Sequence, residues 1–331
     1  MELALDDDQR ALAEVVTTLL QKHSSPARVR AAEADGFDEG LWQALVELGL
    51  PGIAVGPDSA STVDLVVVAE AAGRALATVP LAESVVAALL VHGRSAVADA
   101  VALGAQIAVF APSIAHDGVA RLAPGAGVAS FVVAFDGERL LLADAAGARR
   151  PAASIASLAL ADVPLAGASV IAEGPEAAAL YAQAMTLWRC LTAAIEVGIG
   201  AASLDLGVEY VKTRFQFGVP IGSFQAIQHG LADVAVSVDG ARLLAFEAAA
   251  AIDADDPRAT ELALMAYLFG ADTAHRAAGA SLHYHGGYGY MEEYDVQLYF
   301  RRSKALQLLA GDPQDALDDL AGALFDAEGA R

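Results

Sequence analysis

Residues 210–233 read YVKTRFQFGVPIGSFQAIQHGLAD, and this stretch says more about the fold than any other part of the chain. A helical pattern stops at 217–222, where two glycines and a proline interrupt it, and resumes after Ser223, which stands where an N-cap residue would. The chain has only 20 basic residues against 42 acidic ones, so we expect Arg214 and Lys212 to face an anionic group. On spacing alone, the stretch also fits an ordinary helix–turn–helix.

Two ungapped segments of the C-terminal half carry a family resemblance. The first, 214–233, resembles the acyl-CoA dehydrogenase signature, in which Arg, Phe-Gly, Pro-Ile, Phe-Gln, Gln-His and Leu-Ala-Asp recur at these intervals. The second, 282–311, reads LHYHGGYGYMEEYDVQLYFRRSKALQLLAG and is similar to the family's Gly-Gly turn and the arginine-rich helix after it. The resemblance implies an α+β, mainly α, acyl-CoA dehydrogenase fold, with an N-terminal helical domain, a small middle β-domain and a C-terminal four-helix bundle.

Composition excludes several classes of protein. The chain is 56% hydrophobic with a mean hydropathy of +0.45, but the long uncharged run 100–116 contains glycine, glutamine and proline, so we expect no membrane-spanning helix. The acidic start MELALDDDQR lacks the pattern of a secretory signal, and the single Cys190 is expected to be a small core residue of a cytoplasmic protein. A net charge of −22 argues against nucleic acid as a partner.

The spacing of apolar residues changes from helical to strand-like and back again along the chain. This predicts three domains: 1–104 helical, 105–173 a reduced β-domain and 174–331 a helical bundle. Three- and four-residue apolar spacing predicts helices over 7–22, 38–49, 63–76, 81–103, 175–213, 223–253, 257–281 and 294–310. Short apolar runs between turn signals predict strands over 106–110, 129–135, 139–142 and 168–171.

The resemblance implies a catalytic base that this chain lacks. In the family the base is usually a glutamate nine residues after the arginine that corresponds to Arg301, and that position is Ala310. A minority of members carry the base just before a helix arginine corresponding to Arg189, and that position is Trp188. Neither side chain accepts a proton. A relocated base on the same helix remains an alternative, with these candidates: Glu196, Asp205 and Glu209.

The cofactor contacts implied by the resemblance are unevenly kept. The family's flavin-ring motif has no counterpart in 110–118, and Asp312 would place a negative charge near a bound phosphate. The contacts that a subunit makes with the FAD of its neighbour are kept, with a Gly-Gly turn that lets backbone approach the cofactor. They are Arg214 for the pyrophosphate, Phe217 for packing, Ile221 and Gln225 for the adenosine half, His283 in place of the usual glutamine, and Gly286 and Gly287 at the turn.

This asymmetry leads to an interpretation of function. The chain resembles the short, base-lacking subunit of actinobacterial heterotetrameric acyl-CoA dehydrogenases that degrade steroid side chains. We expect FAD shared with a full-length partner chain, an acyl-CoA substrate in the complex and an electron-transfer flavoprotein as acceptor. Two alternatives stay open, a self-sufficient dehydrogenase with a relocated base and a flavin-free scaffold protein.

Overall fold

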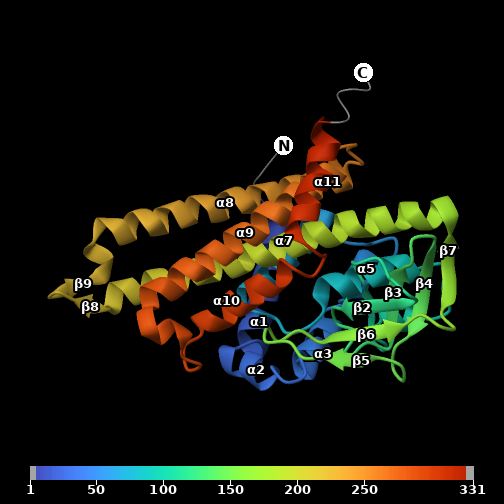
Figure 1. Ribbon diagram of the computed structural model, residues 1–331, viewed down its shortest axis with the longest axis horizontal. Helices are drawn as coiled ribbons and strands as arrows, with labels where there is room; N and C mark the ends of the chain where they lie inside the picture. The colour runs from blue at the N-terminus through green and yellow to red at the C-terminus, as the bar shows by residue number, and fades with distance from the viewer. Residues whose placement is uncertain (1–4, 326–331) are drawn as a thin grey trace.

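The computed structural model describes residues 5–325, and a single long helix organises it. Helix α7 (Gly174–Thr213) runs through the length of the molecule (Figure 1) and contacts α8, α9, α4, α5 and the strands β3, β4 and β7. Its 18-residue apolar window meets the length and composition of a membrane span, which the expectation of no such segment overlooked. Because 72% of that window is buried inside the protein, α7 is read as the core helix.

The N-terminal part is helical. Its elements are α1 (Asp7–His23), α2 (Pro26–Ala31), α3 (Glu39–Glu47), the 3-10 turn η1 (Gly52–Ala54), α4 (Thr62–Arg74), α5 (Leu81–Val91) and α6 (Ala98–Ala102). Side-chain caps fix several starts, including the capping box in which Asp6 and Gln9 satisfy each other's backbone N–H groups before α1. The single helix predicted over 81–103 is wrong: the chain breaks after α5, where Gly93 takes φ +68°.

Seven strands then form two small sheets. They are β1 (Ala108–Phe110), β2 (Val119–Ala123), β3 (Phe131–Phe135), β4 (Arg139–Asp144), β5 (Arg150–Ala152), β6 (Leu160–Pro164) and β7 (Ser169–Glu173). One sheet has the order β1-β3-β4-β7 and the other β2-β6-β5, and a second apolar core lies between them. Only β1 and β3 pair in parallel, and the remaining pairs are antiparallel.

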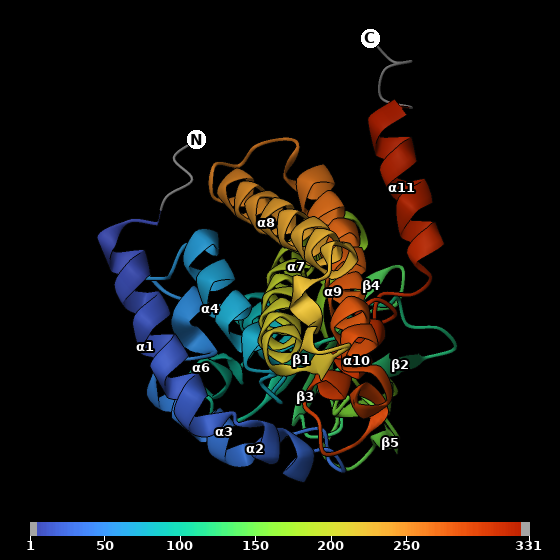
Figure 2. The same cartoon turned by 90° about the vertical axis from the view of Figure 1, so that its left-hand side faces the viewer.

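The C-terminal part is a helical bundle. After α7 come the hairpin β8 (Phe215–Gln216) and β9 (Val219–Pro220), the turn η2 (Ile221–Ser223), α8 (Gln225–Asp253), α9 (Ala259–His285), η3 (Gly286–Tyr290), α10 (Val296–Leu306) and α11 (Pro313–Phe325). The hairpin projects from the end of the bundle that α7 and α8 share, and α11 stands at its flank (Figures 1 and 2).

Two glycines let the N-terminal helices pack against the bundle. A Cβ at Gly73 of α4 would lie 1.9 Å from the carbonyl oxygen of Ile195 on α7, and one at Gly198 of α7 would lie 2.1 Å from that of Glu70. The two backbones therefore touch where α4 crosses α7, an approach that only glycine permits. Helices give way to strands between Ala102 and Ala108 and return at Gly174, while the three-domain division itself stays a prediction.

Candidate cofactor site

The quoted segment folds into a helix end, a tight hairpin and a helix start. Arg214 leaves the helix in an extended conformation, and Phe217 and Gly218 take φ of 54° and 80° at the hairpin turn. Two consecutive residues with positive φ are typical of a type I′ turn, whose twist matches that of the paired strands. The predicted cap is wrong: Ser223 donates to the Pro220 carbonyl at 2.7 Å, and α8 begins after Phe224 with no side-chain cap.

A hollow of about 470 Å³ lies between the end of α7 and the turn η3. It brings together four of the residues expected at the cofactor: Arg214, Ile221, Gly286 and Gly287. The rest of its wall is Tyr210, Gln216, Tyr284, His285, Tyr288 and Met291. The hollow is large enough for part of a nucleotide cofactor, and its wall combines one cation with aromatic side chains and the backbone of two glycines.

Arg214 is the charged group of this hollow. Its guanidinium makes no ion pair with any residue of 5–325, and its Cζ lies 5.6 Å from the centre of the Tyr288 ring. Lys212, the other cation of the segment, is bound to Glu209 with a distance of 2.7 Å between Nζ and Oε1. Arg214 therefore remains available to an external anion, and its planar donors suit two phosphate oxygens.

The Gly-Gly turn gives the hollow an exposed backbone. Gly286 ends α9 with φ 61° and ψ −138°, a combination that is essentially restricted to glycine. A Cβ built at Gly286 or Gly287 would meet no atom within 4 Å, so the space in front of both residues is open. A bound group can approach this main chain closely.

Three of the expected contacts lie outside the wall of the hollow. Phe217 stands at the hairpin tip with 92% of its surface exposed, and its ring meets the edge of Phe224 at 6.2 Å. Gln225 and His283 are exposed, and His283 faces the neighbouring ring of Tyr284. Sequence reasoning overlooked His285, which lines the hollow in place of His283; its only sequence signal was its position beside the turn.

The two positions that carry the base in the family, Ala310 and Trp188 here, have different surroundings. Ala310 is half-buried at the edge of the main core. Trp188 is fully buried, and its indole Nε1 donates to Oε1 of Glu83 on α5 at 3.0 Å. Burial raises the pKa of the Glu83 carboxyl, and the indole hydrogen bond opposes this shift. Glu83 is a buried carboxyl that sequence reasoning missed, because 105 residues separate it from Trp188.

Of the three candidate relocated bases, one is enclosed in the core and two are paired with cations. Glu196 has no exposed surface and neither carboxylate oxygen has a partner within 5–325, so burial raises its pKa well above the usual range. A neutral, enclosed acid cannot reach a substrate. Asp205 pairs with Arg74, and Glu209 pairs with Lys212.

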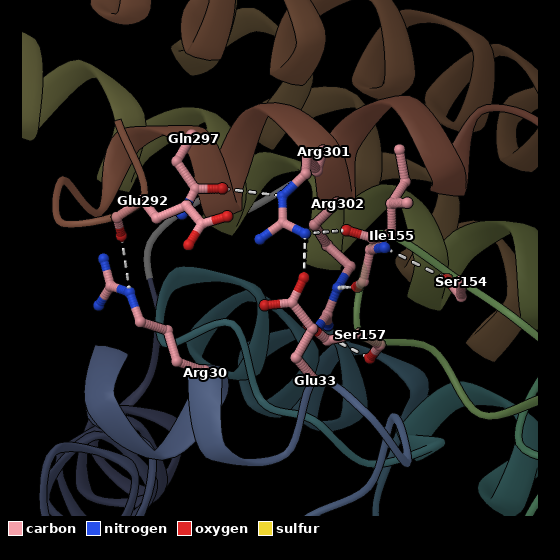
Figure 3. Close-up of polar contacts among 10 residues, drawn as sticks. Arg30, Glu33, Ser154, Ile155, Ser157, Glu292, Gln297, Arg301 and Arg302 are labelled. Carbon is pink, nitrogen blue, oxygen red and sulfur yellow. Dashed lines mark hydrogen bonds and ion pairs between the residues drawn. The ribbon is translucent and has the colours of Figure 1, made fainter. Parts of the chain in front are cut away.

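A second, much smaller cavity of about 50 Å³ lies where the three parts of the chain meet, and Glu83, Thr192 and Arg302 are among its walls. Arg302 of α10 is buried without a carboxylate partner among the described residues. It donates to the carbonyls of Ala156 at 2.5 Å and Ser157 at 3.1 Å (Figure 3). Burial lowers the pKa of this guanidinium to about 10, so it stays charged at neutral pH.

Arg301, next to it, extends the same contact. It bonds to Glu33, beyond the end of α2, and to the carbonyl of Ile155 (Figure 3). Arg302 also donates to the Ala77 carbonyl at 3.3 Å. The two arginines thereby fasten the loop between β5 and β6 against α10 and the N-terminal part.

The comparisons with known proteins agree with this architecture. The acyl-CoA dehydrogenase N-terminal domain matches residues 6–118, and the acyl-CoA dehydrogenase C-terminal domain matches 178–325. The chain belongs to the acyl-CoA dehydrogenase family. The predicted family and its α+β, mainly α fold are thereby confirmed, and the family is one of oxidoreductases.

Relatives of full length support the same assignment. Acyl-CoA dehydrogenase IpdE2 of Mycolicibacterium smegmatis is 33% identical over 97% of this chain and 100% of its own length. The Mycobacterium tuberculosis protein of the same name is 30% identical over 97% and 98%. Among solved structures, the ChsE4–ChsE5 complex of Mycobacterium tuberculosis and the Tcur3481–Tcur3483 steroid acyl-CoA dehydrogenase each give a TM-score of 0.86 at 25% identity, covering 98% of this chain and 99% of the matched chain.

Proposed function

We propose that this chain is the accessory subunit of a heteromeric FAD-dependent acyl-CoA dehydrogenase. It would hold the pyrophosphate and adenosine half of an FAD whose ring and base belong to a catalytically complete partner chain. The observation that carries the proposal is the Arg214 guanidinium, which has no ion-pair partner among residues 5–325, in a hollow with the open Gly286-Gly287 backbone. This set fits the phosphate-bearing half of FAD and offers no carboxylate for the chemistry.

The chain's own residues would bind and orient, and would transfer no proton. When bound, FAD supplies the hydride-accepting chemistry of acyl-CoA oxidation. Arg214 would bind the pyrophosphate through two parallel charge-assisted hydrogen bonds, and the Gly286-Gly287 turn would let main chain approach the cofactor. Ile221 would contact the adenosine half. Phe217 and Gln225, outside the hollow, would reach the same cofactor only where it extends toward the partner chain.

The surface around the hairpin favours a protein partner. Phe215 is 59% exposed, Phe217 92% and Phe224 39%, which makes an apolar cluster beside the proposed phosphate site. Contiguous exposed apolar side chains mark interaction surfaces. A partner that covers them would also exclude water from the cofactor and strengthen the contacts of Arg214.

A pair of unlike chains has two equivalent flavin positions, one completed by the partner's ring site and base and one that would depend on those of this chain. The position that depends on this chain would bind no flavin. Its two base positions carry Ala310 and Trp188, and the cavity beside Glu83 and Arg302 is about 50 Å³. Asp312, which the sequence suggested as a residue facing that position, is exposed and accepts from the backbone N–H of Gln314 at the start of α11. We therefore infer one FAD for each pair of unlike chains.

The names of relatives bear on the substrate and partner. One of the solved relatives is the ChsE4–ChsE5 complex, and another is the Tcur3481–Tcur3483 steroid acyl-CoA dehydrogenase. We extend this to the present chain as a steroid side-chain CoA thioester for the complex, a heterotetramer with a full-length acyl-CoA dehydrogenase, an electron-transfer flavoprotein as acceptor and a cytoplasmic location. The substrate assignment rests on these names and not on any residue that contacts a sterol.

The proposal is tested by measuring acyl-CoA oxidation and flavin colour in the isolated chain and in the complex. The isolated chain should be colourless and should oxidise no acyl-CoA with an artificial electron acceptor, and Ala310→Glu should restore nothing. Co-expression with a full-length acyl-CoA dehydrogenase from the same operon should give a yellow complex. Turnover by the isolated chain would favour a self-sufficient enzyme, and a colourless complex would favour a flavin-free scaffold.

A further inference from the structure

A buried histidine in the wall of the Arg214 hollow has one nitrogen free. His285 is 7% exposed, and its ring is stacked on Tyr210 with 3.9 Å between the ring centres. On another side it meets Tyr294 edge-on at 6.1 Å. These contacts, together with its position as the last residue of α9, fix the plane of the imidazole.

The hydrogen bonds of His285 set its tautomer. Nδ1 lies 2.7 Å from the carbonyl oxygen of Ser281, and a carbonyl only accepts, so Nδ1 carries a proton. In the neutral ring Nε2 then has no hydrogen and is an acceptor. Within residues 5–325 Nε2 makes no hydrogen bond. It is also not one of the fully buried polar atoms that lack a partner, so it can be reached from outside. Since His285 lines the hollow, a bound group can supply that partner.

We propose that His285 is a cofactor-positioning residue whose Nε2 accepts a hydrogen bond from the nucleoside part of the ligand that Arg214 holds by its phosphate. This role rests on the proposed function and adds the direction in which the ligand lies in the hollow. A phosphate belongs at Arg214 and a hydrogen-bond donor belongs at His285. The Tyr288 ring, which stacks on Tyr294 with 5.3 Å between the ring centres and lies 5.6 Å from Arg214 Cζ, forms part of the aromatic wall beside them. Two groups of an adenosine can be the donor, a ribose hydroxyl or the exocyclic amine.

The proposed hydrogen bond to Nε2 has a direction, and this distinguishes it from packing of the ligand against the ring. A ligand that offers an acceptor at this point would face the lone pair of Nε2 and be disfavoured. His285→Phe keeps a planar ring against Tyr210 and removes the acceptor. His285→Gln places an amide oxygen or nitrogen near the position of Nε2 and can keep the hydrogen bond.

The first experiment titrates the flavin-free complex, with only this chain labelled with ¹⁵N at histidine, with ADP. The Nε2 resonance of His285 should begin at the shift of an unprotonated acceptor and move upfield on binding, while the Nδ1 resonance stays in place. 2′-Deoxy-ADP and inosine diphosphate separate the two donors: the analogue that lacks the donor should bind without moving Nε2. An unmoved Nε2 with all three nucleotides would overturn the inference.

The second experiment measures affinity. His285→Phe should weaken the binding of ADP and of FAD to the complex about threefold to tenfold, as expected for one hydrogen bond, and His285→Gln should recover part of it. His92→Phe, at the exposed end of α5, is the matched control and should change neither. Wild-type affinity in His285→Phe, in a complex whose FAD still depends on Arg214, would refute the role of His285 and leave the accessory function standing. If neither the Arg214 variant nor the His285 variant changed the affinity of the complex for FAD, the accessory function itself would be refuted.

Discussion

Removing the charge of Arg214 should abolish most FAD binding without unfolding the protein. The guanidinium has no ion pair within residues 5–325, and its contact with the Tyr288 ring at 5.6 Å is worth only about 0.5–1 kcal/mol to the fold. Charge-assisted hydrogen bonds to a phosphate are each worth about 1.5–3 kcal/mol. Loss of one to two such bonds in Arg214→Ala should therefore raise the FAD dissociation constant of the complex at least about tenfold.

Arg214→Lys sharpens this test. Lysine keeps the charge but not the planar pair of donors, so its effect should fall between wild type and alanine. Arg276→Ala is the matched control, because Arg276 is an exposed bundle arginine that pairs with Asp272 on α9. Fluorescence titration of the apo complex with FAD gives the dissociation constants, and urea denaturation gives the free energies of unfolding. Full flavin affinity in Arg214→Ala would refute the assignment of this residue to the phosphate.

Three predictions concern the buried polar groups. Burial raises the pKa of Glu196 above its value of about 4.3 in the unfolded chain, so the stability of the wild type should fall as pH rises above that value, by up to about 1.4 kcal/mol per pH unit. Glu196→Gln should remove this slope in urea titrations from pH 5 to 8, and an unchanged slope would contradict the neutral buried acid. Trp188→Phe should lower the free energy of unfolding by about 1–3 kcal/mol, because Glu83 loses its donor, and adding Glu83→Leu should recover much of the loss; additive losses would contradict a coupled pair. Arg302→Met should cost at least about 1.5 kcal/mol and speed proteolysis of the loop between β5 and β6, whereas an intact loop would show that it is held in another way.

Sequence patterns were sufficient for the long helices and insufficient for the short elements. The apolar spacing of α7 and α8 and the glycine–proline break between them are strong signals, and both helices were predicted to within two residues of their ends. Helix α2 has only six residues, and α11 begins at Pro313 within a Gly-Asp-Pro run that is typical of a turn. Strands β2, β5 and β6 were missed because alanine-rich runs carry little β signal.

The site shows the same division. Arg214, Ile221, Gly286 and Gly287 were named from the family pattern, and the structure places all four around one hollow. His285 was overlooked because its role depends on a ring stacked across the bundle, which no local pattern contains. Contacts that join distant segments, such as those of Trp188 and Arg302, need the fold before they can be found.

The most direct test of the account is the amount of FAD in the purified complex. FAD released by denaturation is quantified by its absorbance against the two protein chains, with the isolated chain measured alongside. We predict no flavin on the isolated chain and one FAD for each pair of unlike chains, hence two in a tetramer. Two flavins per unlike pair, or flavin bound by this chain alone, would contradict it.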